Sequence, residues 1–320
     1  MKIKSAAVLG AGAVGSYIIG GLTNKEGIEF GVIAEGERAE RLKKQGCLIN
    51  GTVYRPNVWT PEEAHGVDLI IVSLKYGALR GALPAIKSAV GENTIVMSLM
   101  NGVDSEEIIS EVIDKSHILY SLIKIASRKF DNGYCFVPET TMGIILGEPE
   151  VPYESERVKA VEELFEGTFV RTTVTDCIIE EIWCKFRLNV RNNLPQAILR
   201  AGVGCYRDSE HMRAISDGLK AEVEAIAIAK GIDMSKIKPT SSHGTAVKPS
   251  AFYSTLQDLE AHRHTEIDMF AGAVVRMGKE LGIPTPYNEY TYHMIKAIEE
   301  KNDGLFDYDD SKDEVMWSKS

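Results

Sequence analysis

The sequence predicts an α/β protein: an N-terminal domain built on a parallel sheet, followed by an all-helical C-terminal domain. In the first half of the 320-residue chain, short β-forming runs alternate with helical periodicity, which favours a parallel sheet with helices on both faces. After about residue 175, long helical periodicities dominate. We therefore place one domain at residues 1–175 and a second at 176–320, each long enough to bury its own core.

The elements are expected where apolar runs and helical periods are bounded by turn residues. Val67–Leu74 is nearly all apolar, as expected of a strand buried on both faces. The other predicted strands of the first domain are Ser5–Leu9, Phe30–Ala34 and Thr94–Leu99, and its predicted helices are Val14–Thr23 and Glu37–Gln45. The second domain is expected to contain helices at Ile178–Leu199, His211–Lys230 and Leu256–Leu281.

Charge and composition exclude several classes of protein. The formal net charge of −10 argues against a nucleic-acid partner, because the phosphate backbone would be repelled. No uncharged stretch approaches the length of a membrane span, and the five cysteines have no CxxC spacing, so we expect reduced thiols in a cytoplasmic protein. His262 and His264 are two residues apart and point to different helix faces, so we expect no metal site.

A glycine-rich loop follows the first predicted strand and precedes the first predicted helix. In this position the three glycines serve a tight turn, close approach to a pyrophosphate, and tight helix–strand packing. Free N–H groups at the helix N-terminus then favour the anionic phosphates of a dinucleotide. The predicted cofactor-binding residues of the loop are Gly10, Ala11, Gly12, Ala13, Val14 and Gly15.

Glu35 ends the second predicted strand, about twenty residues after the loop. A carboxylate there usually accepts hydrogen bonds from the adenosine ribose hydroxyls, which points to NAD. Arg38 and Arg41 follow closely and are able to bind a 2′-phosphate, which points to NADP. All three side chains would also suit a solvated helix start, so this pattern leaves the cofactor undecided.

Two further strands end in polar residues. Lys75 follows Val67–Leu74, and Asn101 follows Thr94–Leu99 just before Gly102. Ligands of open α/β sheets bind beyond the carboxyl ends of the strands, so both residues are candidates to line the cofactor. The alternatives are that the lysine marks a return to solvent and that Asn-Gly forms a turn.

In the second domain, Lys185, Asn189 and Asn193 are spaced to form one stripe on a helix. Their neighbours are apolar, so the helix is expected to be well buried and its polar side chains to need partners. A stripe of one charged donor and two amides suits a carboxylate and a carbonyl. The alternative is a polar network inside a helical core.

Ser254 and Gln257 have the spacing of a capping box, and capping alone would explain Ser254. Glu266 stands just before an apolar helical run.

Taken together, the chain resembles the ketopantoate reductase (2-dehydropantoate 2-reductase) family over essentially its whole length. The resemblance rests on the motifs G-A-G-A-V-G, S-L-K, M-N-G, K-F-R-L-N-V-R-N-N, and S-T-L-Q-D followed by R-H-T-E-I-D. It implies a Rossmann domain followed by a helical domain like that of 6-phosphogluconate dehydrogenase, with the site in the cleft. The implied reaction is hydride transfer from NADPH to a 2-keto acid.

By this resemblance Lys185 is the catalytic acid, and Asn189, Asn193 and Ser254 hold the keto acid. Lys75 and Asn101 would line the cofactor, and Glu266 would contact the nicotinamide side and help to position Lys185. The expected partner is a small 2-keto acid, and a homodimer is the assembly that we consider.

The chain departs from the family pattern at two places. Glu35 stands where the family often has an arginine for the 2′-phosphate of NADPH, so NADH is also considered as cofactor. After Asn193 the family frequently has a further polar contact to substrate, whereas this chain continues L-P-Q-A-I-L. A reductase of another small 2-keto acid therefore stays open, as does a non-catalytic NADP(H)-binding sensor.

Overall fold

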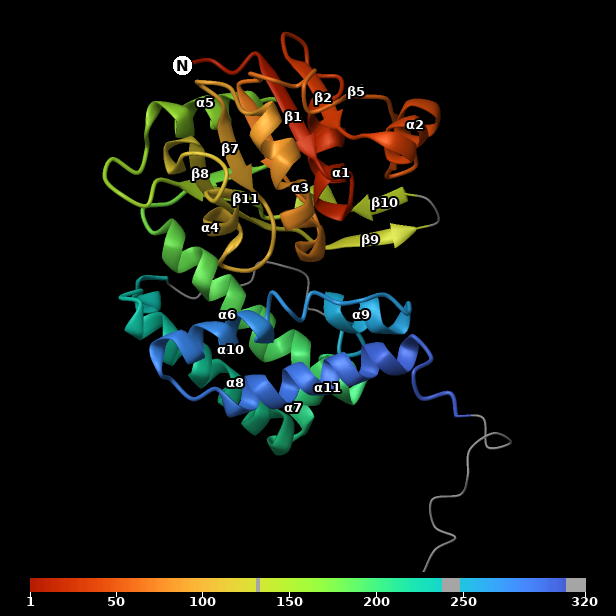
Figure 1. Cartoon of the computed structure of the whole chain (residues 1–320), viewed down its shortest axis with the longest axis vertical. Coiled ribbons are helices and arrows are strands. Elements are labelled where there is room, and N and C mark those ends of the chain that lie inside the picture. The colour runs from red at the N-terminus through yellow and green to blue at the C-terminus, as the bar shows by residue number, and fades with distance from the viewer. Residues whose placement is uncertain (131–132, 238–247, 309–320) are drawn as a thin grey trace, which may run out of the picture. The chain divides into compact units, whose positions relative to one another are not determined.

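The computed structural model describes residues 1–130, 133–237 and 248–308 (Figure 1). The chain divides into two compact units, the first Met1–Phe186 with Gly231–Thr245 and the second Arg187–Lys230 with Ala246–Ser320. Helix α6 (Ile178–Leu199) begins close to the expected domain boundary, and the division between the units falls within this helix. The boundary at residue 175 stays a prediction.

The first unit is built on an eight-stranded sheet with the order β12-β11-β8-β7-β6-β1-β2-β5. Six of its strands, from β8 to β5, are parallel, whereas β11 runs antiparallel to β8 and β12 follows the direction of β11. The predicted fold class is confirmed, with these two opposed strands added at one edge. The strands are β1 (Ser5–Leu9), β2 (Glu29–Ile33), β5 (Asn57–Trp59), β6 (Leu69–Val72), β7 (Ile95–Ser98), β8 (Ile118–Lys124), β11 (Gly143–Gly147) and β12 (Thr172–Val174).

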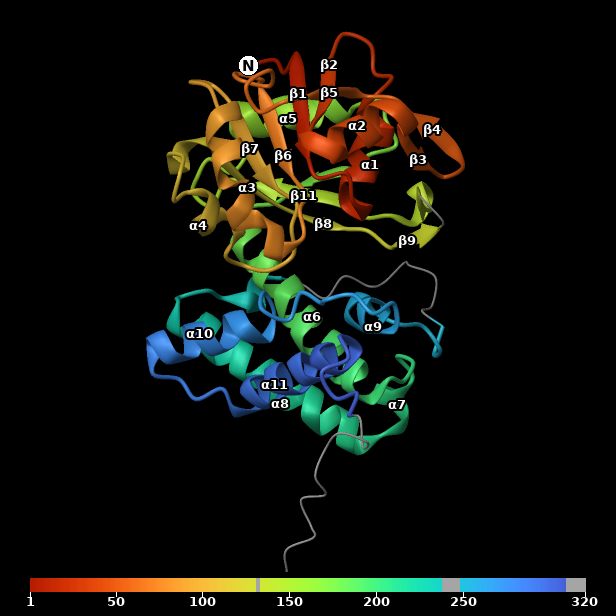
Figure 2. The same ribbon diagram turned by 45° about the vertical axis from the view of Figure 1, so that its right-hand side comes forward.

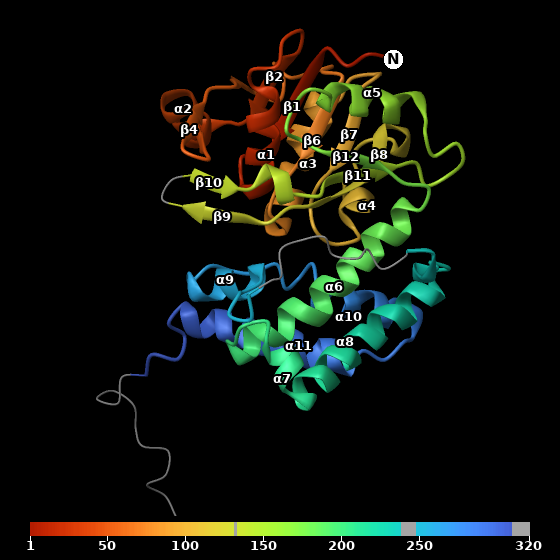
Figure 3. The ribbon, with the colours of Figure 1, turned by 180° about the vertical axis from the view of Figure 1, so that it is seen from behind.

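Helices cover both faces of this sheet, so alternate residues of a central strand enter different cores. Ala6 and Val8 of β1 pack in one apolar cluster with α1 and α5, and Ala7 and Leu9 pack in the other with α3 and α4. Figures 1 and 3 show these two layers from opposite sides. The helices are α1 (Ala13–Leu22), α2 (Gly36–Gln45), α3 (Tyr76–Ala89), α4 (Ser105–Ile109) and α5 (Glu156–Phe165).

A small second sheet, with the order β4-β3-β10-β9, accompanies the first unit. It contacts α1 through β3, β9 and β10, and β3, β4 and β9 are seen near α1 in Figure 2. Its strands were not predicted, because runs of three or four residues carry little periodicity. They are β3 (Cys47–Ile49), β4 (Thr52–Tyr54), β9 (Ser127–Phe130) and β10 (Gly133–Phe136).

The second unit is helical. It contains the end of α6, followed by α7 (Cys205–Asp208), α8 (Glu210–Ala229), α9 (Ser254–Glu260), α10 (Ala271–Leu281) and α11 (Pro286–Asn302). Helix α6 has the predicted bounds, and α8 lies within one residue of its predicted bounds. Within the described ranges, no helix is long and apolar enough to cross a membrane.

The prediction of one helix over Leu256–Leu281 is wrong, because the structure has two helices separated by residues 261–270. The break has a local cause. His262 adopts a left-handed backbone with φ of 49°, and the Asp258 carboxylate accepts a 3.0 Å bond from Arg263 Nε just beyond the helix end. These interactions end α9 although the apolar periodicity continues.

Candidate active site

The glycine-rich loop joins β1 to α1, and its geometry tests whether a dinucleotide fits. A Cβ on Gly15 would lie 1.8 Å from the Gly10 carbonyl oxygen, and one on Gly10, whose φ is +110°, would lie 2.7 Å from the Ser73 carbonyl oxygen. Both positions therefore require glycine. A Cβ on Gly12 would meet no atom within 4 Å, so Gly12 borders open space.

This arrangement fits a pyrophosphate. Gly12 is the N-cap residue of α1, whose first turn has no acidic side chain, so an anion there would meet helix N–H groups without repulsion from that turn. The loop is also tied to the sheet, because the buried Ser73 hydroxyl donates a 2.8 Å hydrogen bond to the Gly10 carbonyl oxygen. The residues present thus fit a dinucleotide cofactor.

The other predicted cofactor residues follow the strands that neighbour β1. In the order β7-β6-β1-β2, the chain beyond each strand carries Asn101, Lys75, Gly10 and Glu35 in turn. The four strands are parallel, so their carboxyl ends lie at one edge of the sheet. The structure therefore brings these residues to the edge at which open α/β sheets bind ligands.

Lys75 and Glu35 begin the helices that leave this edge. Lys75 is the N-cap residue of α3 and Glu35 that of α2, and both are exposed. Arg38 and Arg41 are exposed on α2 as well. The NAD and the NADP interpretation of this segment therefore both stay predictions. Just after Lys75, the Tyr76 hydroxyl donates a 2.7 Å bond to the Asp104 carboxylate.

Lys185, the predicted catalytic acid, contacts Asn101 within the first unit. Its half-buried ammonium group donates a 2.8 Å hydrogen bond to Asn101 Oδ1. One turn earlier on α6, Glu181 pairs with Lys124 at 2.9 Å, and Lys124 is the last residue of β8. Both side chains of that pair are largely shielded, at 17% and 24% exposure, so the pair anchors the start of α6 to the sheet. In the sequence only the family resemblance connects Asn101 with Lys185, whereas in the structure the two side chains are hydrogen-bonded directly.

In the second unit, Asn193 and Ser254 come together. Asn193 is buried, and its Nδ2 donates a 3.4 Å bond to the Ser254 hydroxyl, while Asn189 lies one turn earlier on α6 and is half-buried. Helix α9 begins at Ser254 with Tyr253 as its N-cap, so the capping-box interpretation of Ser254 is wrong. A capping serine stands just before the first helical residue, whereas Ser254 is itself the first residue of α9.

Gln196, which sequence reasoning missed, fixes the approach to Ser254. This fully buried side chain donates from Nε2 to the Ala251 carbonyl at 3.0 Å and accepts from Tyr253 N at 2.8 Å. A glutamine in an apolar stretch of helix was the available signal, since a buried amide needs partners.

Glu266 lies half-buried between α9 and α10, where its carbonyl oxygen accepts hydrogen bonds from Met269 N and Phe270 N. The preceding residue, Thr265, is held by the buried Glu299 of α11, whose Oε1 accepts bonds of 2.6 Å from both Thr265 N and Thr265 Oγ1. The predicted action of Glu266 on Lys185 stays a prediction.

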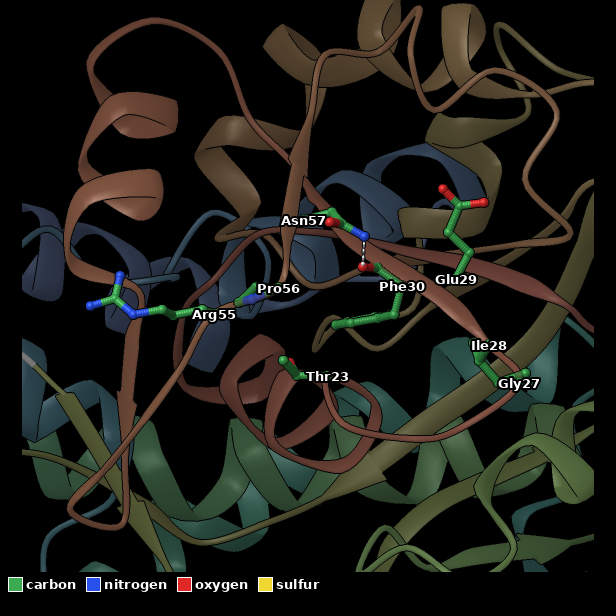
Figure 4. Close-up of a pocket in the computed structure, with 8 residues that line it drawn as sticks. All are labelled: Thr23, Gly27, Ile28, Glu29, Phe30, Arg55, Pro56 and Asn57. Atoms are coloured by element: carbon green, nitrogen blue, oxygen red, sulfur yellow. Dashed lines mark hydrogen bonds between the residues drawn. The ribbon is translucent and has the colours of Figure 1, made fainter.

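A pocket of about 490 Å³ lies elsewhere in the first unit (Figure 4). It is lined by Phe30 and Asn57 among others, and Asn57 Nδ2 donates a 3.0 Å bond to the Phe30 carbonyl oxygen. These residues stand near the amino ends of β2 and β5, whereas the glycine loop follows a carboxyl end. This pocket therefore does not belong to the candidate site.

Comparison with known proteins agrees with this geometry. The model of the family "Ketopantoate reductase PanE/ApbA" matches residues 6–141, and that of its C-terminal part matches residues 177–299. The chain belongs to the ketopantoate reductase family. It is accordingly an NAD(P)H-dependent oxidoreductase that acts on a 2-keto acid.

Individual relatives match along almost their whole length. A 2-dehydropantoate 2-reductase of Pyrococcus horikoshii is 29% identical, with 93% of this chain and 98% of the relative covered. A ketopantoate reductase family structure from Ralstonia eutropha has a TM-score of 0.76 at 24% identity, covering 93% of this chain and 99% of that one. The ternary structure of D-mandelate dehydrogenase with NADH and anilino(oxo)acetate has a TM-score of 0.78 at 22% identity, covering 93% and 99%. At these identities the solved structures establish the shared fold.

Proposed function

We propose that this chain reduces 2-dehydropantoate (ketopantoate) to pantoate with NADPH, a step of pantothenate biosynthesis. The observation that carries the proposal is the 2.8 Å bond from Lys185 to Asn101, because it joins the predicted acid to the residue that follows β7 at the cofactor edge of the sheet. A non-catalytic sensor would have no need of this pair. The curated relative from Pyrococcus horikoshii carries the name of the proposed activity.

The chemistry requires a proton and a positive charge at the oxygen of the keto group. The reduced nicotinamide, when bound, supplies the hydride for the C2 carbonyl. Lys185 then protonates the developing alkoxide as a general acid and stabilises its charge. Asn101 holds the lysine head by accepting one of its hydrogens.

The remaining polar residues of α6 and α9 orient the keto acid in this proposal. Asn189, Asn193 and Ser254 offer amide and hydroxyl groups to its carboxylate and hydroxyl, which fixes the carbonyl for attack. Glu266 is assigned the role that the family resemblance implies, which is to help position Lys185. The glycine loop, Glu35 and Lys75 hold the dinucleotide.

Glu35 makes NADH an alternative cofactor in this proposal. A carboxylate beside the ribose repels the 2′-phosphate of NADPH, and the exposed Arg38 and Arg41 are the groups that would offset this. Measuring the dissociation constants of both cofactors decides between them.

Another small 2-keto acid is the second candidate substrate, and the hydrogen bonds of Gln196 support this alternative. The family's further polar contact follows Asn193, but in this chain both ends of the Gln196 amide are engaged by Ala251 and Tyr253. A contact from Gln196 to substrate would therefore cost two buried hydrogen bonds. Ketopantoate would be bound with one polar contact fewer than in much of the family.

A panel of 2-keto acids, assayed with purified protein and with both NADPH and NADH, tests this proposal. We expect ketopantoate-dependent oxidation of the cofactor. Activity with another keto acid alone would overturn the proposed substrate and keep the reaction class, and cofactor binding without turnover of any keto acid would favour the sensor.

We also propose that the protein is cytoplasmic and that it forms a homodimer. Light scattering of the purified protein tests the dimer.

A further inference from the structure

A buried polar cluster joins the end of β7 to the start of α4 in the first unit. Ser98, Ser105 and Glu106 form it, and their exposed fractions are 1%, 3% and 6%. Ser105 Oγ donates a 2.8 Å bond to Glu106 Oε2, and the Ser98 and Ser105 hydroxyl oxygens lie 2.8 Å apart. None of these residues was singled out by the sequence motifs, and none belongs to the proposed catalytic set.

The direction of these hydrogen bonds follows from counting hydrogens. A serine hydroxyl has one hydrogen, and that of Ser105 is given to Glu106, so Ser98 must donate to Ser105. Ser98 Oγ in turn accepts from the backbone N–H of Met100 at 3.4 Å. The bonds therefore all run one way, from Met100 to the carboxylate, and such chains strengthen one another.

The Met100 end of this chain of bonds lies next to the candidate site. Met100 directly precedes Asn101, which accepts the bond from Lys185. The other side of Ser98 is fixed as well, because its carbonyl oxygen accepts a 2.9 Å bond from the Ser121 hydroxyl of β8. Ser98, Ser105 and Glu106 thus hold the turn that carries Asn101 from within the core.

We propose that Glu106 is a positioning residue, which acts through Ser105 and Ser98 to fix the turn bearing Asn101 and thereby the ammonium group of Lys185. The inference rests on the proposed function of Lys185. Glu106 touches neither substrate nor cofactor in this account. It acts on the reaction only through the hydrogen-bonded chain.

The protonation state of Glu106 then makes the site sensitive to pH. Burial, which has the largest effect, and the neighbouring charges of Asp104 and Glu107 together raise the pKa of the Glu106 carboxyl to about 7, against the hydrogen bond from Ser105. The Tyr120 phenol of β8 also faces this group, and the Glu106 charge contributes to raising the pKa of Tyr120. The ionised carboxylate is the stronger acceptor, so the chain of bonds is tightest above about pH 7 and loosens below it.

The test compares Glu106→Gln and Ser105→Ala with Glu107→Gln, which removes the same charge from an exposed neighbour. For each variant we would measure kcat and KM for ketopantoate between pH 5.5 and 8.5, and the dissociation constant of NADPH by fluorescence. We expect Glu106→Gln to lower kcat at pH 8.5 by about tenfold with little change in KM, since small displacements of a catalytic group cost this much or more. It should also lose the acid limb near pH 7 that the wild-type protein and Glu107→Gln display.

A wild-type pH profile and kcat in Glu106→Gln would overturn the inference, as would equal effects of Glu106→Gln and Glu107→Gln.

If the wild-type protein reduces no 2-keto acid, the proposed function fails, and the inference is then tested by the affinity for the cofactor. Asn101 is expected to line the cofactor, so Ser105→Ala should weaken NADPH binding at least threefold relative to Glu107→Gln. Unchanged affinity in the folded Ser105→Ala variant would refute the inference separately.

Discussion

Replacing Glu106 with glutamine should change how the stability of the protein depends on pH. The folded protein raises the pKa of this carboxyl from 4.5 to about 7. An acid with a raised pKa contributes stability that is fully present below the unfolded pKa of about 4.5 and is lost as pH rises through about 7. At 1.36 kcal/mol per pKa unit the total loss is about 3 kcal/mol, and about 2 kcal/mol of it falls between pH 5.5 and 8.5.

Glutamine keeps the acceptor for Ser105 but does not titrate, so Glu106→Gln should be spared this loss. The melting temperature of the variant relative to the wild-type protein should therefore rise by about 4–8 °C between pH 5.5 and 8.5 for a unit of this size. Thermal unfolding followed by circular dichroism at several pH values measures this difference, and Glu107→Gln is the control expected to stay parallel to the wild-type protein. Parallel melting curves for Glu106→Gln would refute the assignment of a raised pKa to this buried carboxyl.

Three further predictions concern cofactor and substrate. Gly15→Ala should raise the NADPH dissociation constant at least about tenfold, because its Cβ would lie 1.8 Å from the Gly10 carbonyl oxygen, and Gly81→Ala, which meets no atom within 4 Å, should leave binding unchanged. Preference for NADPH over NADH should stay below about a hundredfold, or some 2.7 kcal/mol, because of Glu35, and a larger ratio of the measured dissociation constants would contradict its predicted role. Asn193→Ala should raise KM for the keto acid about tenfold, and an unchanged KM would limit Asn193 to its bond with Ser254.

Long-range periodicity accounts for the parts of the fold that the sequence predicted correctly. Strand β1 and helix α6 have the predicted bounds, since each combines a continuous apolar pattern with clear ends. The break between α9 and α10 was missed because it depends on side-chain contacts of Asp258 and on the backbone of His262, neither of which alters the apolar spacing.

The candidate site was only partly predictable, for a similar physical reason. Residues at the ends of buried strands, such as Lys75 and Asn101, stand out in a sequence because a polar side chain follows an apolar run. Their partners do not stand out. The residues joined by the Lys185–Asn101 bond are far apart in the chain, and nothing in either local pattern encodes their meeting.

Buried polar side chains that support the site were the hardest to foresee. Ser73, Ser98 and Glu106 look ordinary in sequence, because serine and glutamate are common on surfaces. Their burial becomes apparent only when the sheet and its covering helices are assembled. Hydrogen-bond satisfaction in the core then gives each of them a definite partner.

Substitution of Lys185 by alanine tests the central claim most directly. A general acid acts mainly in the transition state, so Lys185→Ala should lower kcat for ketopantoate reduction about a hundredfold or more. The affinity for NADPH, measured by fluorescence titration, should change no more than a few-fold, because the glycine loop is untouched and the substitution reaches the cofactor only through Asn101. A thermal melt must accompany the kinetics, since the change also removes the bond to Asn101. A folded Lys185→Ala protein with near-normal kcat would contradict the account and leave Lys185 as a structural partner of Asn101.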